Sequence, residues 1–103
     1  MAFTATLSSG SGAATIHLAG ELDASTAPDF HEAIDDAVAT GAGRLVIDAS
    51  ELTYIASAGL RALVFARQKV AEDVVIAITG VTEPVLKVIR MAGLDHGFAI
   101  ATS

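Results

Sequence analysis

The chain has 103 residues, 52% of them hydrophobic, and a formal net charge of −6. This size and apolar content fit one compact domain over residues 1–103 with a core of its own. No apolar run approaches the roughly 18 residues that cross a bilayer, and residues 1–12 lack the basic start and apolar block of a secretory signal. The absence of cysteine excludes disulfides, thiol catalysis and cysteine-based metal sites. We therefore expect a cytoplasmic protein without direct membrane insertion.

Charge is distributed unevenly along the chain, because every Lys and Arg lies at position 44 or later. The acidic residues of the first 43 positions are Glu21, Asp23, Asp29, Glu32, Asp35 and Asp36. Such a surface repels phosphate backbones, so we expect no nucleic-acid partner and favour a basic protein surface. An acidic surface that only keeps the domain soluble remains the alternative.

The first half reads as two strands and a helix. Strands are expected over residues 2–7 and 14–19, with residues 8–12 (SSGSG) as the turn between them. Period-two alternation sets His17 on the opposite face from Ile16 and Leu18. The helix that follows has Ser25 or Thr26 as N-cap, and Thr26 with Asp29 resembles a capping box.

The second half alternates strands and helices. We expect a short strand at 44–47, a loop through residue 51, an apolar piece at 52–55 and a helix at 58–70. A strand buried on both faces at 74–78, a helix between Thr82 and Gly93, and an edge strand at 98–101 complete the chain. The resulting order, ββαβαβαβ, predicts an α/β domain: a mixed, mostly parallel sheet flanked by helices.

A search for catalytic chemistry finds no recognisable site. The three histidines fall in three different elements, no HExxH pair provides a zinc site, and no glycine-rich loop fits a nucleotide. Asp35 and Asp36 diverge by about 100° on a helix and read as a solvated face. We expect no enzyme activity, no catalytic residue, no metal and no cofactor; a hydrolase that uses Ser57 is a minor alternative without a base beside it.

Ser57 stands out in the segment YIASAGLRAL, residues 54–63. Its simplest role is that of an N-cap for the second helix, worth about 1 kcal/mol. Small neighbours, Ala56, Ala58 and Gly59, leave the hydroxyl accessible to an enzyme. Gly59 in the first helical turn costs roughly 1 kcal/mol against alanine, and close approach of another molecule is one compensation. A helix start also accommodates the charge of a phosphate.

Three segments carry a family resemblance: LVIDASELTYIASAGLRALV in the centre, GELDASTAPDF at 20–30, and VTEPVLKVIRMAGLDHGF at 81–98. Together they resemble STAS domains, and more narrowly the bacterial anti-sigma factor antagonists. The resemblance implies the STAS-like mixed sheet and a partner-switching cycle. In that cycle the unphosphorylated antagonist binds an anti-sigma factor that is a GHKL-type serine kinase, phosphorylation releases it, and a serine phosphatase restores it.

By alignment the phosphoacceptor is Ser57, and the loop acid of the docking surface is Asp23. Ala56 stands where the family commonly has an acid. The docking surface is expected to comprise residues from the GELD loop and from the start of the second helix: Glu21, Asp23, Ser25, Ala56, Ser57, Ala58, Gly59, Leu60 and Arg61. The alternative function is that of a STAS accessory subunit of a membrane transport complex of the ABC lipid-transport type, without a phosphorylation switch.

Overall fold

The computed structural model describes residues 3–102 and has the expected element order. Its strands and helices are β1 (Thr4–Gly10), β2 (Ala13–Leu22), α1 (Ala27–Ala39), β3 (Arg44–Ile55), α2 (Ser57–Lys69), β4 (Val75–Val81), α3 (Glu83–Met91), a 3-10 turn (Asp95–Gly97) and β5 (Ala99–Thr102). Within the described part of the chain, no helix combines the length and apolar character needed to cross a membrane.

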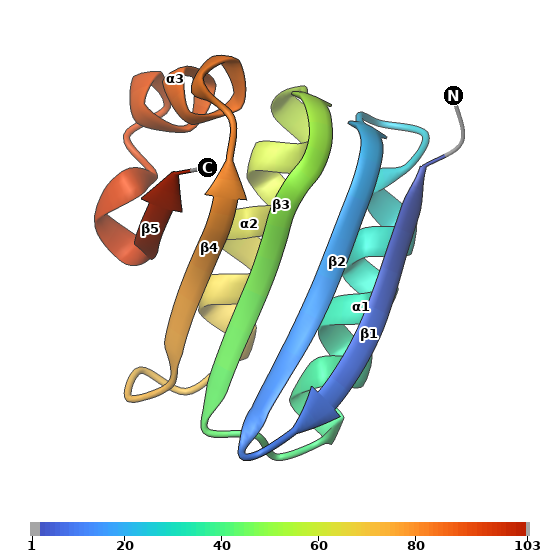
Figure 1. Cartoon of the computed structure of the whole chain (residues 1–103), viewed down its shortest axis with the longest axis vertical. Helices are drawn as coiled ribbons and strands as arrows, with labels where there is room; N and C mark the ends of the chain where they lie inside the picture. The colour runs from blue at the N-terminus through green and yellow to red at the C-terminus, as the bar shows by residue number, and fades with distance from the viewer. Residues whose placement is uncertain (1–2, 103) are drawn as a thin grey trace.

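The five strands form one sheet in sequence order, β1-β2-β3-β4-β5. β1 runs antiparallel to β2, and every later neighbour pair is parallel. Figure 1 shows α1 and α2 side by side behind the sheet, with α3 beyond the end of β4. The α/β class and the mixed sheet are therefore confirmed. α1 follows β2 and α2 follows β3. Because these two strands are parallel, the starts of α1 and α2 lie at the same end of the sheet.

The first hairpin is longer than the sequence predicts. Its turn consists of Ser11 and Gly12 alone, with φ of 55° and 80°. Two consecutive positive φ values fit the twist of a two-residue hairpin turn, so pairing continues through Gly10. The predicted turn at residues 8–12 was thus too long, and Ala2 of the predicted first strand lies outside the described residues.

β3 is a single strand rather than a strand, a loop and a short apolar piece. Its pairing with β2 shifts once between His17 and Ala19 and again between Gly20 and Glu21. At each shift β3 contains one more residue than β2, which is the signature of a bulge. Pairing resumes after each bulge, so residues 48–51 (DASE), which predicted a loop, lie inside a continuous strand.

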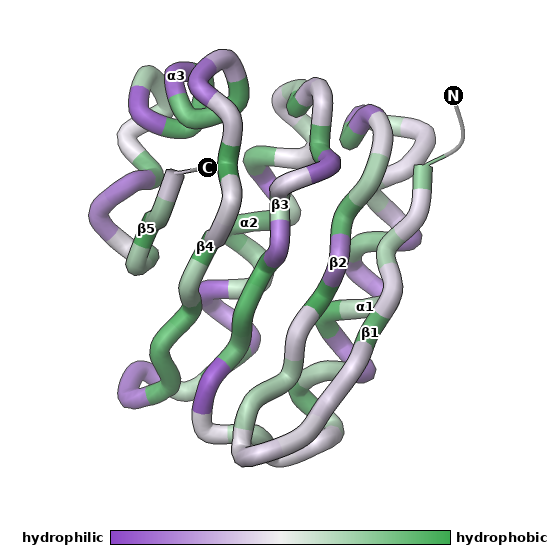
Figure 2. Tube along the Cα trace, in the orientation of Figure 1, coloured by the Kyte–Doolittle hydropathy of each residue, from purple (hydrophilic) through white to green (hydrophobic). Residues whose placement is uncertain are grey.

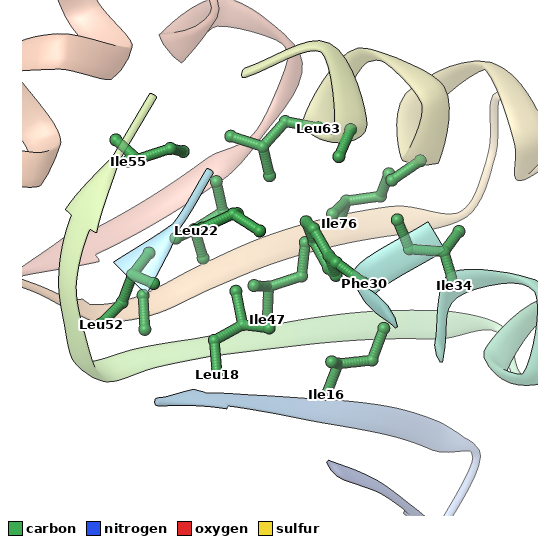
Figure 3. Packing of buried hydrophobic residues seen from close by; sticks show 14 of the residues in the cluster. Ile16, Leu18, Leu22, Phe30, Ile34, Ile47, Leu52, Ile55, Leu63 and Ile76 are labelled. Carbon is green, nitrogen blue, oxygen red and sulfur yellow. The ribbon is translucent and has the colours of Figure 1, made fainter. Parts of the chain in front are cut away.

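The core fills the space between the sheet and the helices. Phe30 and Ile34 of α1 and Leu63 of α2 point into it from the helices, as Figure 3 shows. The sheet contributes buried residues such as Ile16, Leu22, Ile47, Leu52, Ile55 and Ile76. Figure 2 shows hydrophobic stretches along β2, β3 and β4, the three inner strands of the sheet. Their position explains why the parallel strands read as nearly continuous apolar runs.

Gly59 packs directly against this core. A Cβ atom at Gly59 would lie 2.7 Å from Cγ1 of Ile55, 2.8 Å from Cγ of Leu22 and 2.9 Å from Cδ2 of Leu22. The glycine therefore compensates its helix cost through a close approach inside the chain. The suggestion that it accommodates another molecule was wrong in this respect.

The Gly59→Ala variant should be less stable than the natural chain. Overpacking typically costs about 1–3 kcal/mol, and the better helix propensity of alanine returns up to about 1 kcal/mol. We expect a net loss of about 1–2 kcal/mol in the free energy of urea unfolding. Gly43→Ala is the control, because no atom lies within 4 Å of a Cβ there. A Gly59→Ala variant as stable as the natural chain would contradict this packing role.

Candidate functional site

The ends of β2 and β3 bring the two predicted site segments together. Leu22 pairs with Ile55 in the sheet, and the backbone N–H of Ala56 donates to the carbonyl of Leu22 over 2.9 Å. The residues that follow these partners are Asp23 in one segment and Ser57 in the other. A backbone hydrogen bond thus joins the end of β2 to the start of α2. The GELD segment, predicted as a loop, is part of β2 up to Leu22, and only Asp23 begins the loop.

A compact hydrogen-bond network organises the loop after β2. The carboxylate Oδ1 of Asp23 accepts bonds from the Ser25 hydroxyl at 2.7 Å, the Ser25 N–H at 2.9 Å and the Thr26 N–H at 3.2 Å. The hydroxyl bond from Ser25 is the main reason that the pKa of Asp23 lies below its ordinary value of 3.8. Asp23 is therefore ionised at neutral pH and held in one orientation.

Thr26 is the N-cap residue of α1, as predicted, but it does not form the predicted capping box. Its hydroxyl donates to the carbonyl of Glu21 at 2.9 Å and accepts from the N–H of Asp23 at 2.9 Å. No side-chain hydrogen bond caps α1. The threonine is used to close the loop back onto β2, and Asp29 has no part in that contact.

Ser57 lies one residue inside α2 rather than at its cap. The N-cap is Ala56, whose extended backbone leads into the helix, and no side chain caps the helix start. Ser57 is exposed, whereas Ala56 and Ala58 are partly buried. Its predicted capping role was therefore wrong, because alanine occupies the capping position. The hydroxyl is left at the surface of a helix start that has no acidic residue in its first turn.

The other residues expected on the docking surface differ in exposure. Glu21, Ser25 and Arg61 are exposed, Asp23 and Leu60 are partly buried, and Gly59 is buried. The loop and the helix start thus offer a mixed surface of charge and small apolar groups. Gly59 contributes no exposed side chain to it.

Beside this surface, a groove of about 690 Å³ separates α1 from α2. Its small apolar lining comes from Ala24, Ala27, Pro28 and Ala58, and its charged or titratable lining from His31, Glu32, Asp35 and Arg61. Farther along, the ring of His31 stacks on Phe65 with centroids 4.5 Å apart. Lys69 completes the contact, with Nζ 3.5 Å from Asp35 and 5.9 Å from the Phe65 ring. These contacts fix the spacing of the two helices.

Sequence reasoning missed a line of polar side chains on three adjacent strands. Nδ1 of His17 lies 2.9 Å from Asp48 Oδ2, and Nε2 of His17 lies 3.5 Å from the Ser8 hydroxyl. The Ser50 N–H also bonds Asp48, and it is the main cause of the lowered pKa of that carboxyl. Alternation on β2 set His17 opposite the core residues, but only the parallel register brings Asp48 beside it.

The histidines do not converge on Ser57. His17 lies within the strand line just described, and His31 stacks on a residue eight positions beyond Ser57, about 12 Å along the helix. No group of three or more metal-binding side chains occurs within residues 3–102. The surface around Ser57 thus combines hydroxyls, carboxylates, the guanidinium of Arg61 and small apolar groups, an arrangement suited to recognition and modification.

Comparison with known proteins agrees with the fold and the motifs. The family described as Mlab, STAS domain matches residues 5–101. The chain belongs to the STAS domain family. Anti-sigma-F factor antagonist RsfB of Mycobacterium tuberculosis is 31% identical over 97 residues, which cover 94% of this STAS domain and 80% of RsfB.

Solved structures extend the comparison. The crystal structure of an anti-sigma factor antagonist from Mycobacterium paratuberculosis superposes with a TM-score of 0.90 at 27% identity, covering 99% of this STAS domain and 87% of that chain. SpoIIAA has been solved unphosphorylated, with a TM-score of 0.73 at 18% identity, covering 99% and 89%. Bacillus SpoIIAA in phosphorylated form gives 0.69 at 20%, covering 99% and 93%. At such identities the SpoIIAA structures show the shared fold.

Removal of the Ser25 hydroxyl should change the titration of the Asp23 carboxyl. In Ser25→Ala the pKa of Asp23 should rise toward 3.8, because the main hydrogen bond to the ionised carboxylate is removed. A lowered folded-state pKa stabilises the fold above the unfolded pKa, and this contribution disappears as the pH falls through the folded value. The Ser25→Ala variant should therefore lose less stability than the natural chain as the pH falls through the folded-state pKa of Asp23.

Carbon-13 titration of the aspartate carboxyls measures this shift. Asp48 is the internal control, since the Ser50 backbone is the main cause of its lowered pKa and the variant leaves that contact intact. An unchanged Asp23 titration in Ser25→Ala would show that the hydroxyl bond does not set the pKa.

Proposed function

We propose that this STAS domain is an anti-sigma factor antagonist whose binding to a serine-kinase anti-sigma factor is controlled by phosphorylation of Ser57. The observation that carries the proposal is the exposed hydroxyl of Ser57, which does not cap the helix and lies beside the ordered Asp23 loop. The similarity to RsfB and to the Mycobacterium paratuberculosis antagonist supports the protein class. Their names describe antagonists of another protein, which agrees with a binding role rather than catalysis.

Electrostatics supports a charge switch at this position. Phosphorylation adds about −1.5 to −2 charges at neutral pH. The helix start of α2 tolerates this charge, since its free N–H groups and dipole favour anions and its first turn holds no carboxylate. The domain therefore keeps its fold when modified.

The same charge acts against a bound partner. Asp23 is already ionised next to the start of α2, and Glu21 is exposed at the end of β2. A dianion on Ser57 loses its hydration when this surface is buried against the partner, and the phosphate adds bulk there. We expect the unphosphorylated surface, with the partly buried Leu60 and the exposed Arg61, to bind the kinase and the phosphorylated one to release it. A serine phosphatase completes the cycle, and the proteins of such a cycle are cytoplasmic.

The acceptor assignment predicts the outcome of a mass measurement. Incubation with ATP and an extract of the source cells should add one phosphate to the natural chain and none to Ser57→Ala. Ser9→Ala is the matched control: it removes an exposed hydroxyl from β1, outside the expected docking surface, and should still be modified. Phosphate on Ser57→Ala would assign another acceptor. An unmodified natural chain would favour the alternative of a transport-complex subunit without a switch.

The charge mechanism predicts the effect of a single substitution on affinity. Ser57→Asp should weaken binding of the purified kinase partner at least about tenfold, because the added carboxylate loses its hydration when the surface around Ser57 is buried against the partner. The asparagine of Ser57→Asn has nearly the same shape as the aspartate of Ser57→Asp but carries no charge. Ser57→Asn should therefore bind much more tightly than Ser57→Asp. Isothermal titration measures both. Equal affinities of the two variants would attribute release to bulk and refute the charge switch.

A further inference from the structure

The outer edge of β1 is a second candidate interaction surface, on the far side of α1 from the groove described above. β1 is the last strand of the sheet and pairs only with β2 among the described strands. Every second residue of an edge strand directs its backbone N–H and carbonyl outward, away from the sheet. The edge therefore offers a row of backbone hydrogen-bond partners to another chain.

This edge lacks the usual protection against strand addition. Residues Thr4–Gly10 contain no charged residue and no proline, and the pairing with β2 runs through all seven without a bulge. Edges are normally protected by charge, proline, bulges or short length. The opposite edge, β5, has only four residues. An exposed, regular strand of this length is suited to binding an extended segment.

The acidic residues of α1 beside the β1 edge favour a basic segment as its binding partner. A groove of about 390 Å³ lies between residues 4–7 of β1 and helix α1, and three exposed carboxylates line it: Asp29, Glu32 and Asp36. Their spacing puts them on one side of α1 over about 10 Å. None forms a salt bridge within residues 3–102. Figure 2 shows β1 as a pale tube next to the hydrophilic residues of α1.

We propose that the outer edge of β1 binds an extended, basic segment of a partner protein, which adds a strand to the sheet and sets its cationic side chains against Asp29, Glu32 and Asp36. Alternate residues of a strand lie about 7 Å apart on one face, so two or three Lys or Arg residues match the spread of the carboxylates. This surface does not involve Ser57, and the proposal stands independently of the phosphorylation switch.

A second copy of this chain fits the edge poorly. Two β1 edges that paired would bring two sets of the same carboxylates together, and β1 itself contributes no Lys or Arg. Like charges facing each other across an interface oppose association. The charge pattern thus favours a different, basic chain over self-pairing.

The test uses the whole chain and a defined probe: a capped seven-residue peptide that alternates lysine and valine. In nitrogen-15 spectra the peptide should shift the amides of β1, including Ala5 and Leu7, and leave those of α3 in place. The same peptide with every backbone amide N-methylated keeps its charge and length but has no N–H donors. It should bind about tenfold more weakly or worse, since strand addition depends on these bonds.

Neutralised variants test the charge selection. Asp29→Asn/Glu32→Gln/Asp36→Asn should weaken the peptide about tenfold at low salt, from three partly screened ion pairs. Glu51→Gln/Glu72→Gln/Asp73→Asn is the control with the same net charge, and it should bind like the natural chain. Unchanged spectra outside β1 and α1 verify the fold of each variant.

Several results would overturn the proposal. They are equal weakening in the two triple variants, equal binding of the N-methylated peptide, shifts concentrated away from β1, no binding, or a dimer of the natural chain paired through β1. The N-methylated peptide keeps the test decisive even where a variant fails to fold, because it needs no change in the protein.

Discussion

The close approach of Gly59 to Leu22 and Ile55 is the contact on which the candidate site depends. A side chain there would push α2 away from the strand ends, and a glycine lets the first turn of the helix rest directly on them. The backbone bond from Ala56 to Leu22 then ties the helix start to the loop that follows β2. The position of Ser57 beside Asp23 thus follows from the packing of Gly59 against Leu22 and Ile55, which are both buried.

Most of the fold follows from patterns that the sequence displays. The alternation of strands and helices, the proline near the start of α1 and the apolar run of β4 predicted the order ββαβαβαβ and the mixed sheet. The errors lie where long-range pairing overrides local signals. Residues 48–51 read as a loop, but pairing with β2 keeps β3 extended through two bulges, beyond Asp48, where its pairing with β4 ends.

The candidate site shows the same division. Small residues around position 57 and the helix start after it predicted an accessible serine, and Ser57 is exposed. Its shift from the cap to the first helical position was beyond local reasoning, since element boundaries vary by a residue or two. The polar contact between His17 and Asp48 joins residues 31 positions apart. No spacing rule in one sequence gives that register, and the role of Gly59 as a packing residue also emerged only from the fold.

The two proposed surfaces divide the molecule by the type of contact they offer. The surface around Ser57 consists of side chains at the carboxyl ends of the strands, where one modification changes the charge. The β1 edge consists of backbone groups, and its acidic flank selects charge without a switch.

A dianion at Ser57 should change the binding surface and leave the core intact. Amide hydrogen exchange of the phosphorylated and unphosphorylated chains measures this directly. Protection of core amides such as Ile16, Ile47 and Ile76 should be equal in both forms, with differences confined to the Asp23 loop and the first turn of α2. A loss of protection across β2 and β3 on phosphorylation would mean that release works by unfolding, and it would contradict this account.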